Sequence, residues 1–193
     1  MPIRTLDARD AEDFVDLLTA LDRETEYLMF EPGERPVDIG SLRRRLANRD
    51  PANGLLYALV DPAPGAGDAP SGPDAPDGPD EPTPRAPDEP LTGFVGGQRR
   101  AGRRNRHVMH LVVAIRQSRV GRGHGRALLD AVEGFARREG VSRIELSVQV
   151  DNPRAIGLYE RAGFEREGVQ RRAALLRDGW RDAYAYAKLL DPA

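Results

Sequence analysis

A glycine-rich loop with the sequence VGRGHGR, from Val120 to Arg126, is the stretch of this chain best suited to binding chemistry. The apolar run at 110–115 before it predicts a strand, and apolar residues at helical spacing after it predict a helix. A strand, a glycine-rich turn and a helix bring free backbone N–H groups and the positive end of a helix to one point. The loop therefore predicts a site for a phosphate-bearing molecule.

Two common phosphate ligands fit this loop poorly. It lacks the Gly-Lys-Ser/Thr ending with which nucleoside-triphosphate loops reach the terminal phosphate and magnesium. It also lies past the middle of the chain, after a predicted hairpin, whereas a dinucleotide-binding loop follows an early strand. The sequence therefore favours neither a nucleoside triphosphate nor a dinucleotide as the ligand of this loop.

Composition excludes several other kinds of site. The 193 residues suffice for one well-buried domain, and the absence of Cys excludes disulfides, thiolate metal sites and a cysteine nucleophile. Histidines stand only at 107, 110 and 124, without the spacing of a metal-binding helix, so no metal is expected. No apolar run is as long as a membrane span and the N-terminus lacks a signal-peptide core, so we expect a soluble, cytoplasmic protein.

Residues 61–90 differ in composition from the rest of the chain. They hold ten of the sixteen prolines and eight acidic residues against one Arg, a net charge of −7 that leaves about +5 for the remainder. Such a segment has too little apolar surface to offset the entropy lost on ordering. Because strands are predicted on both sides, we expect a disordered acidic insert within a single domain at 1–193.

The elements around the loop follow from hydrophobic periodicity and capping signals. Asp7, Asp38 and Asn152 stand where helix N-caps are expected, and Gly140 stands where a helix should end. The segment 24–33 breaks the helical period and is either a loop or one wall of a substrate pocket. The fold class is α/β, with a mixed, mostly antiparallel sheet of about seven strands flanked by about four helices. Strands are expected at 3–6, 55–60, 91–98, 107–115, 143–150 and, as a hairpin turning at 177–180, within 164–190; helices are expected after residues 7 and 38, at 126–140 and from 153.

A second segment identifies the ligand by resemblance. The run VDNPRAI at 150–156, followed by LYERAGF at 158–164, together with the glycine loop resembles the two sequence motifs of the GNAT family. GNAT proteins are GCN5-related N-acetyltransferases that use acetyl-CoA. The resemblance covers about residues 107–190 and implies that the loop binds the pyrophosphate of acetyl-CoA as a co-substrate. One departure is Val120, which stands where the family usually has Gln or Arg.

The resemblance also implies roles for single residues. Backbone groups near Val113 and Ile115 would bond the pantetheine arm, and Asn152 would contact the cofactor or act only as an N-cap. The loop residues implied to bind the cofactor are Val120, Gly121, Arg122, Gly123, His124, Gly125 and Arg126.

Tyr159 matches the tyrosine that donates a proton to the departing thiolate and also contacts the cofactor, its alternative being a core residue. A phenol suits this role because it is neutral at pH 7. For the general base, His110 occupies a position where many relatives have Glu, although a strand-face histidine without catalytic function is an open alternative. Glu145 and Glu26 are the other candidates.

These inferences predict transfer of an acetyl group to a primary amine by direct attack, without a covalent enzyme intermediate. The acceptor is a small-molecule or peptide amine, a membrane partner is not expected, and a homodimer is left open. One alternative is a GNAT-like domain that senses acyl-CoA without turnover. Another is an RNA-binding protein that uses the five arginines at 99–106, although no aromatic residue lies among them to stack a base.

Overall fold

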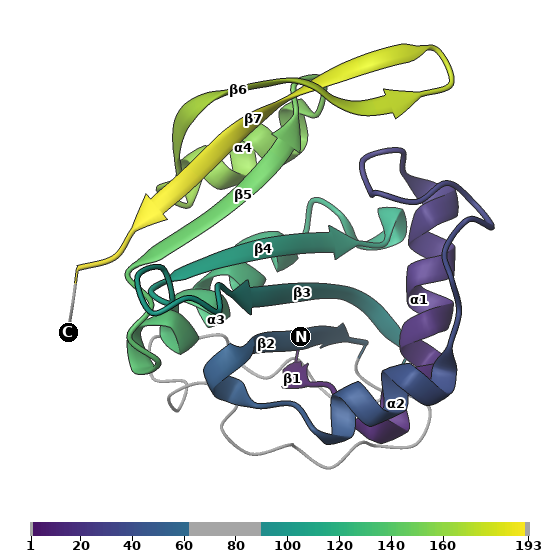
Figure 1. Ribbon diagram of the computed structural model, residues 1–193. Coiled ribbons are helices and arrows are strands. Elements are labelled where there is room, and N and C mark those ends of the chain that lie inside the picture. Colours follow the sequence, from purple (N-terminus) through teal and green to yellow (C-terminus); the bar gives the residue numbers. More distant parts are fainter. Residues whose placement is uncertain (1, 62–89, 192–193) are drawn as a thin grey trace.

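The computed structural model describes residues 2–61 and 90–191, and within them one seven-stranded sheet forms the centre of the molecule (Figure 1). Its strand order is β1-β2-β3-β4-β5-β7-β6. Neighbouring strands are antiparallel except β4 and β5, which are parallel. The expected mixed, mostly antiparallel sheet is therefore confirmed. The strands are β1 (Ile3–Thr5), β2 (Gly54–Val60), β3 (Leu91–Arg99), β4 (Val108–Ile115), β5 (Arg143–Gln149), β6 (Glu165–Leu176) and β7 (Gly179–Leu189).

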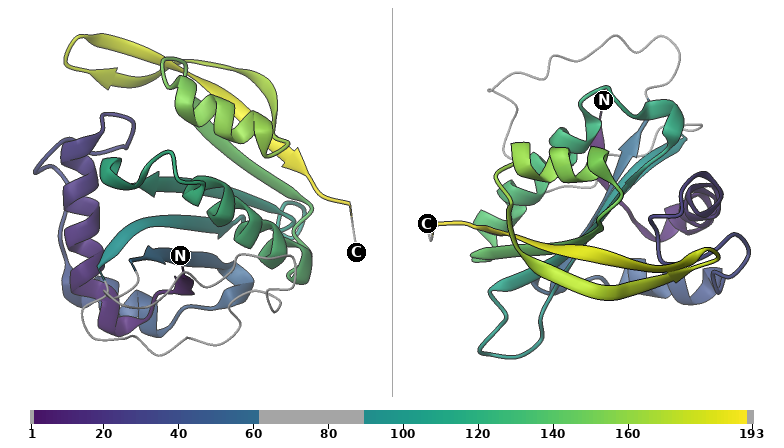
Figure 2. Two further views of the ribbon diagram at one scale, coloured as in Figure 1. Left: turned by 180° about the vertical axis from the view of Figure 1, so that it is seen from behind. Right: turned by 90° about the horizontal axis from the view of Figure 1, so that it is seen from above.

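In the described residues, four α-helices cover the two faces of the sheet in pairs. α1 (Ala11–Glu24) and α2 (Ile39–Ala47) lie on one face, and α3 (His124–Arg138) and α4 (Pro153–Arg161) lie on the other (Figure 2). Each pair encloses its own apolar core. In β4, for example, Ala114 packs with the α1 side while Leu111 packs with the α3 side, as period-two alternation requires.

The capping signals of the sequence are confirmed where they bear on the site. Asp38 Oδ1 accepts a hydrogen bond of 2.8 Å from the Ser41 N–H, and Asn152 Oδ1 accepts one of 3.1 Å from the Ala155 N–H. Gly140 has a φ of 66°, the left-handed conformation that ends α3. α3 begins at His124, two residues before the predicted start, because the glycine loop itself forms its N-terminal cap.

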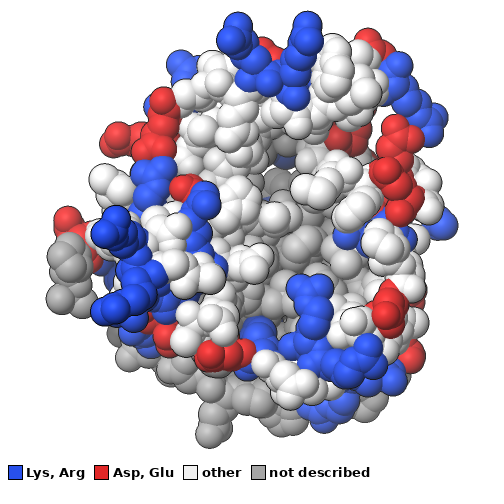
Figure 3. Space-filling view, in the orientation of Figure 1, with Lys and Arg blue, Asp and Glu red and all other residues white. Residues whose placement is uncertain are grey.

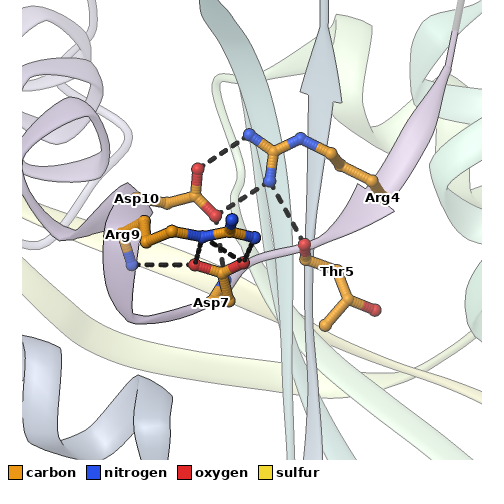
Figure 4. A network of polar contacts seen from close by, with 5 residues as sticks. All are labelled: Arg4, Thr5, Asp7, Arg9 and Asp10. Atoms are coloured by element: carbon orange, nitrogen blue, oxygen red, sulfur yellow. Dashed lines mark hydrogen bonds and ion pairs between the residues drawn. The ribbon is translucent and has the colours of Figure 1, made fainter. Parts of the chain in front are cut away.

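Asp7 is an N-cap, as predicted, but the α-helix does not start directly after it. Asp7 caps a 3-10 turn at Ala8–Asp10, and α1 begins only at Ala11. The buried Asp10 carboxylate explains the extra turn, because it receives both Nη atoms of Arg4, at 2.7 and 2.8 Å, and the Asp7 N–H (Figure 4). This pair joins β1 to α1, and β1 itself ends one residue earlier than predicted.

The predicted acidic insert lies outside the described residues apart from Asp61 and Pro90 at its ends. Within the described ranges, no helix is both long and apolar enough to cross a membrane.

Candidate active site

The parallel strands β4 and β5 separate shortly after they meet, and this opening is the centre of the candidate site. Their pairing runs only from Val108↔Arg143 to His110↔Glu145, although both strands continue beyond it. On its other side β4 pairs with β3 as far as Ile115. β4 therefore has one paired edge and one edge that opens towards β5.

The hydrogen-bond pattern of β4 shows which residues face the opening. The carbonyl of Val108 accepts from Arg100 and the N–H of Arg116 donates to Thr92, so even-numbered residues direct their backbone groups towards β3. Odd-numbered residues direct theirs towards β5, as His107 does when it accepts from Arg143. Past the last pair, this places the backbone groups of Val113 and Ile115 at the opening, together with those of Leu111.

The glycine loop lies where β4 ends and α3 begins. Gly121 and Gly123 have φ values of 79° and 83°, and no atom lies within 4 Å of the Cβ that either would carry as alanine. Gly123 is the N-cap of α3 and no side chain caps this end. Within the described residues, no hydrogen bond is found from the backbone N–H groups of 121–126. The loop thus has the open, donor-rich shape that suits a pyrophosphate group.

The third glycine of the loop has a different role. A Cβ at Gly125 would lie 2.8 Å from Leu158 Cδ2, a distance at which one of the two groups must move. Gly125 therefore allows α3 to pack closely against α4. Its link to a cofactor is indirect, through the position of the helix end.

One side chain of the loop is already engaged, and another is half-buried without a partner for its Nε2 among the described residues. The Arg126 guanidinium contacts Asp130 at 2.8 Å and the Arg161 carbonyl at 3.0 Å, which directs it along the helix. His124 is half-buried and its Nε2 has no hydrogen-bond partner within the described residues. Burial, together with the charges of Arg122 and Arg119, holds the pKa of His124 below its usual value. A neutral imidazole at this position is therefore expected at pH 7.

Tyr159 of α4 is buried on the face of the sheet that α3 and α4 cover. It packs against Phe164 with ring centroids 5.8 Å apart and is 7% exposed. Burial raises the pKa of Tyr159 to about 12. Its hydroxyl makes no hydrogen bond within the described residues, so the phenol is protonated and its proton is not committed to a protein acceptor. The structure thus places Tyr159 in the apolar core, and its role as a proton donor stays a prediction.

The three candidate bases lie on or near the opposite face, the one covered by α1 and α2. His110 is exposed at the last β4–β5 pair, where the strands begin to separate. Glu145, its register partner, is hydrogen-bonded by Arg100 and Arg143. Partial burial pushes the pKa of Glu145 up, but these two arginines bring it below the usual value, which makes Glu145 a weak base. Glu26 is exposed in the loop after α1.

The loop after α1 closes one end of this face. The Tyr27 hydroxyl donates to the Asp151 carbonyl at 3.0 Å, and Gln149 Nε2 donates to the Glu26 carbonyl at 3.2 Å. Arg177, at the tip of the β6–β7 hairpin, pairs with Glu31 at 3.2 Å. Figure 3 shows a hollow on this face, bordered mostly by uncharged residues with basic and acidic side chains among and beyond them. The segment 24–33 is thus a loop after the end of α1, and the alternative, one wall of a substrate pocket, stays a prediction. Sequence reasoning had not singled out Gln149.

The arginine-rich turn at 99–106 lies at the opposite end of β4 from the glycine loop. Arg100 pairs with Glu145, and Arg99 donates to the Arg106 carbonyl at 2.9 Å. Arg99 therefore holds the turn itself together and Arg100 ties it to β5, which weakens the case for a nucleic-acid surface. In the described part of the chain, no group of side chains could hold a metal ion.

Part of the sequence matches the model of a known protein family. Residues 80–164 match the model of the Acetyltransferase (GNAT) family. Over 87 residues the chain is 36% identical to the L-amino acid N-acetyltransferase AaaT of Escherichia coli (strain K12), an alignment that covers 45% of this chain and 54% of that protein. The chain spans about half or less of the curated relatives it matches.

Solved structures show the same fold over nearly the whole chain. An acetyltransferase of the GNAT family from Streptococcus pneumoniae superposes with a TM-score of 0.78 at 23% identity and covers 98% of both chains. The putative acetyltransferase yncA from Salmonella typhimurium, solved with its cofactor acetyl-CoA, gives a TM-score of 0.75 at 18% identity and covers 100% of this chain and 95% of that one. At these identities the likeness concerns the fold.

Proposed function

Because the chain belongs to the GNAT family through residues 80–164, we propose that it is an acetyl-CoA-dependent N-acetyltransferase acting on a primary amine. One observation carries the proposal: the open edge of β4 is followed by the start of α3, a helix end without a side-chain cap in a loop with two left-handed glycines. These features suit the two polar parts of one extended cofactor, its pantetheine amides and its pyrophosphate.

The residues of the chain would hold acetyl-CoA mainly through the backbone. The N–H groups of residues 121–124 would face the pyrophosphate, while that of Val120 donates to the Gln117 carbonyl. Because the contacts come from the backbone, Val120 can stand where relatives have a longer polar residue. Backbone groups of Val113 and Ile115 bond the pantetheine amides. Arg122, which makes no ion pair among the described residues, adds positive charge beside the phosphates. Bound in this way, acetyl-CoA supplies a thioester at the opening between β4 and β5.

Two side chains would move protons. Tyr159 protonates the leaving thiolate, since its buried phenol is neutral and its hydroxyl has no partner within the described residues. His110 accepts the proton of the amine, directly or through water, from the opposite face of the sheet. The amine attacks the thioester carbonyl directly, and a backbone N–H of β4 polarises that carbonyl.

A small molecule or the end of a peptide fits the acceptor side best, because the loop after α1 and the β6–β7 hairpin limit the hollow. The relative that acts on L-amino acids makes these the first acceptors to try.

Release of CoA thiol tests the proposal. Acetyl-CoA is incubated with the protein and each of the twenty L-amino acids, a polyamine set and short peptides, with a no-amine control. We expect amine-dependent thiol release, and we expect His110→Ala to lower kcat at least ten-fold while the Kd for CoA stays within two-fold. Tight CoA binding without thiol release from any acceptor would contradict the proposal and support a sensor without turnover.

A further inference from the structure

The short turn that leads into the glycine loop is capped by a residue of a distant element. Gln117–Arg119 form a 3-10 turn, and the side chain of its own N-cap residue, Arg116, makes no capping bond. The carboxylate of Glu24, the last residue of α1, takes that place. Its Oε2 accepts from the Gln117 N–H at 2.8 Å, and its Oε1 accepts from Arg116 Nε at 2.6 Å. The C-terminal end of α1 is thereby joined to the chain just past β4 (Figure 1).

Two backbone hydrogen bonds connect this contact with the glycine loop. The Arg119 N–H donates to the Arg116 carbonyl at 2.8 Å, and the Val120 N–H donates to the Gln117 carbonyl at 3.4 Å. Both acceptors belong to the two residues that Glu24 holds. Because Val120 is the first residue of the glycine loop, the Glu24 carboxylate fixes where that loop begins.

The charges around Glu24 would otherwise count against a carboxylate at this position. An acidic side chain in the last turn of a helix is unfavourable, because that end of the helix carries partial negative charge. A carboxylate beside the segment that leads into a phosphate-binding loop also opposes the binding of an anion. The bonds from Arg116 and from the Gln117 N–H are the favourable contacts, and both act on the turn.

We propose that Glu24 is a positioning residue for the cofactor: it fixes the turn at Gln117–Arg119 and thereby the glycine loop that receives the pyrophosphate. It acts through the backbone of the turn and not by contact with the ligand. Because α1 continues into the loop at 25–33, the same contact ties the acceptor-side loop to the cofactor site. This inference rests on the proposed acetyltransferase function.

Glu24→Gln tests the proposal because a carboxamide offers one oxygen to the two donors, so the turn loses half of its cap. Asp22→Asn is the matched control, since it also removes one negative charge near the end of α1. The Asp22 carboxylate receives the Arg35 guanidinium at 2.6 and 2.7 Å, a pair that holds the segment between α1 and α2 and not the turn. Calorimetry measures the Kd for CoA of each protein, and urea unfolding measures its stability.

We expect Glu24→Gln to raise the Kd for CoA about five-fold or more, the usual scale for losing a hydrogen bond to a charged group. Asp22→Asn should leave this Kd within about two-fold of the wild type, as for a substitution that does not touch the site, although it removes a buried ion pair. A purely electrostatic role of Glu24 would have the opposite sign, because removing a carboxylate favours an anionic ligand. A lowered or unchanged Kd in Glu24→Gln, or an equal rise in both variants, overturns the proposal.

A measurement without ligand keeps this test separate from the proposed function. The backbone amide resonances of residues 119–124 are compared by NMR in the wild type and both variants. We expect them to shift in Glu24→Gln and to stay in place in Asp22→Asn. Unshifted loop resonances in Glu24→Gln, or shifts of equal size in the two variants, contradict the inference. A wild type that fails to bind CoA, or that releases no thiol with any acceptor, would count against the proposed function, while the amide resonances still decide whether Glu24 fixes the loop.

Discussion

At the scale of single residues, the protonation state of Tyr159 is decided by burial. No charged partner contributes to the shift, so the raised pKa reflects the cost of placing a phenolate among apolar neighbours. A thiolate leaving group needs a neutral donor, and Tyr159 remains one throughout the range in which the protein would work. We therefore expect Tyr159→Phe to lower kcat by about 100-fold, within the usual range for loss of a general acid. The Kd for CoA should change little, and an unchanged kcat would remove Tyr159 from the mechanism.

The same shift makes stability depend on alkaline pH. The unfolded chain loses the Tyr159 proton near pH 10, while the folded chain keeps it until about pH 12. Between these values the folded state binds more protons, so the free energy of unfolding falls as pH rises. We expect the wild type to lose up to about 1.4 kcal/mol per pH unit more than Tyr159→Phe in this window. Urea unfolding of both proteins at pH 9, 10 and 11 measures the difference, and parallel curves would contradict it.

At the scale of elements, α3 offers an internal control for its own phosphate site. Gly123 at its N-terminal end and Gly140 past its C-terminal end both have left-handed φ angles, of 83° and 66°, and neither has an atom within 4 Å of a would-be Cβ. Alanine at either position adds the same kind of backbone strain, about 1–2 kcal/mol. Only at Gly123 would the added methyl also project into the space assigned to the pyrophosphate.

We therefore expect Gly123→Ala and Gly140→Ala to lower the free energy of unfolding by similar amounts, while only Gly123→Ala raises the Kd for CoA, by ten-fold or more. Thermal unfolding and CoA titration by calorimetry measure the two effects. Equal CoA affinities in the two variants would show that the glycine serves only the turn.

The long edge strand β6 is held by contacts that periodicity cannot reveal. Ser147 of β5 bonds Gln170 of β6, and Arg143 bonds Glu167 at 2.8 Å, both reaching across β7. They can cross because β7 presents alanines at 183, 185 and 187 as register partners of the β5 face. Small residues on a central strand thus allow long side chains to brace an exposed edge.

At the scale of the whole molecule, the sequence was most informative at helix ends, where a residue type has a well-defined effect on the local backbone. The caps at Asp38 and Asn152 and the end of α3 at Gly140 follow from short-range chemistry and are confirmed. Contacts between distant segments were not predictable. Nothing in the sequence shows that Gln149 meets the backbone of Glu26, or that Arg126 donates to the carbonyl of the distant Arg161. The choice among the candidate general bases depends on such contacts. The hydrogen bonds that Arg100 and Arg143 donate to Glu145 could not be predicted from the sequence.

The buried pair between Arg4 and Asp10, only six residues apart in the sequence, joins the first strand to the α1 layer. Asp10 is fully buried and Arg4 is 4% exposed. Asp10→Ala would leave the Arg4 charge buried without this partner and would remove the acceptor of the Asp7 N–H (Figure 4). We expect it to lower the free energy of unfolding by about 3–5 kcal/mol.

Glu12→Ala is the control, since Glu12 pairs with Arg43 at 3.0 Å on the surface, where such a contact contributes less than about 1 kcal/mol. Replacing both members, as Arg4→Met with Asp10→Leu, should recover part of the loss, because an apolar pair leaves no buried charge. Urea unfolding measures all four proteins. Equal stabilities of Asp10→Ala and Glu12→Ala would mean that the pair does not hold β1 and α1 together, and that the apolar core around Leu6 and Phe14 suffices.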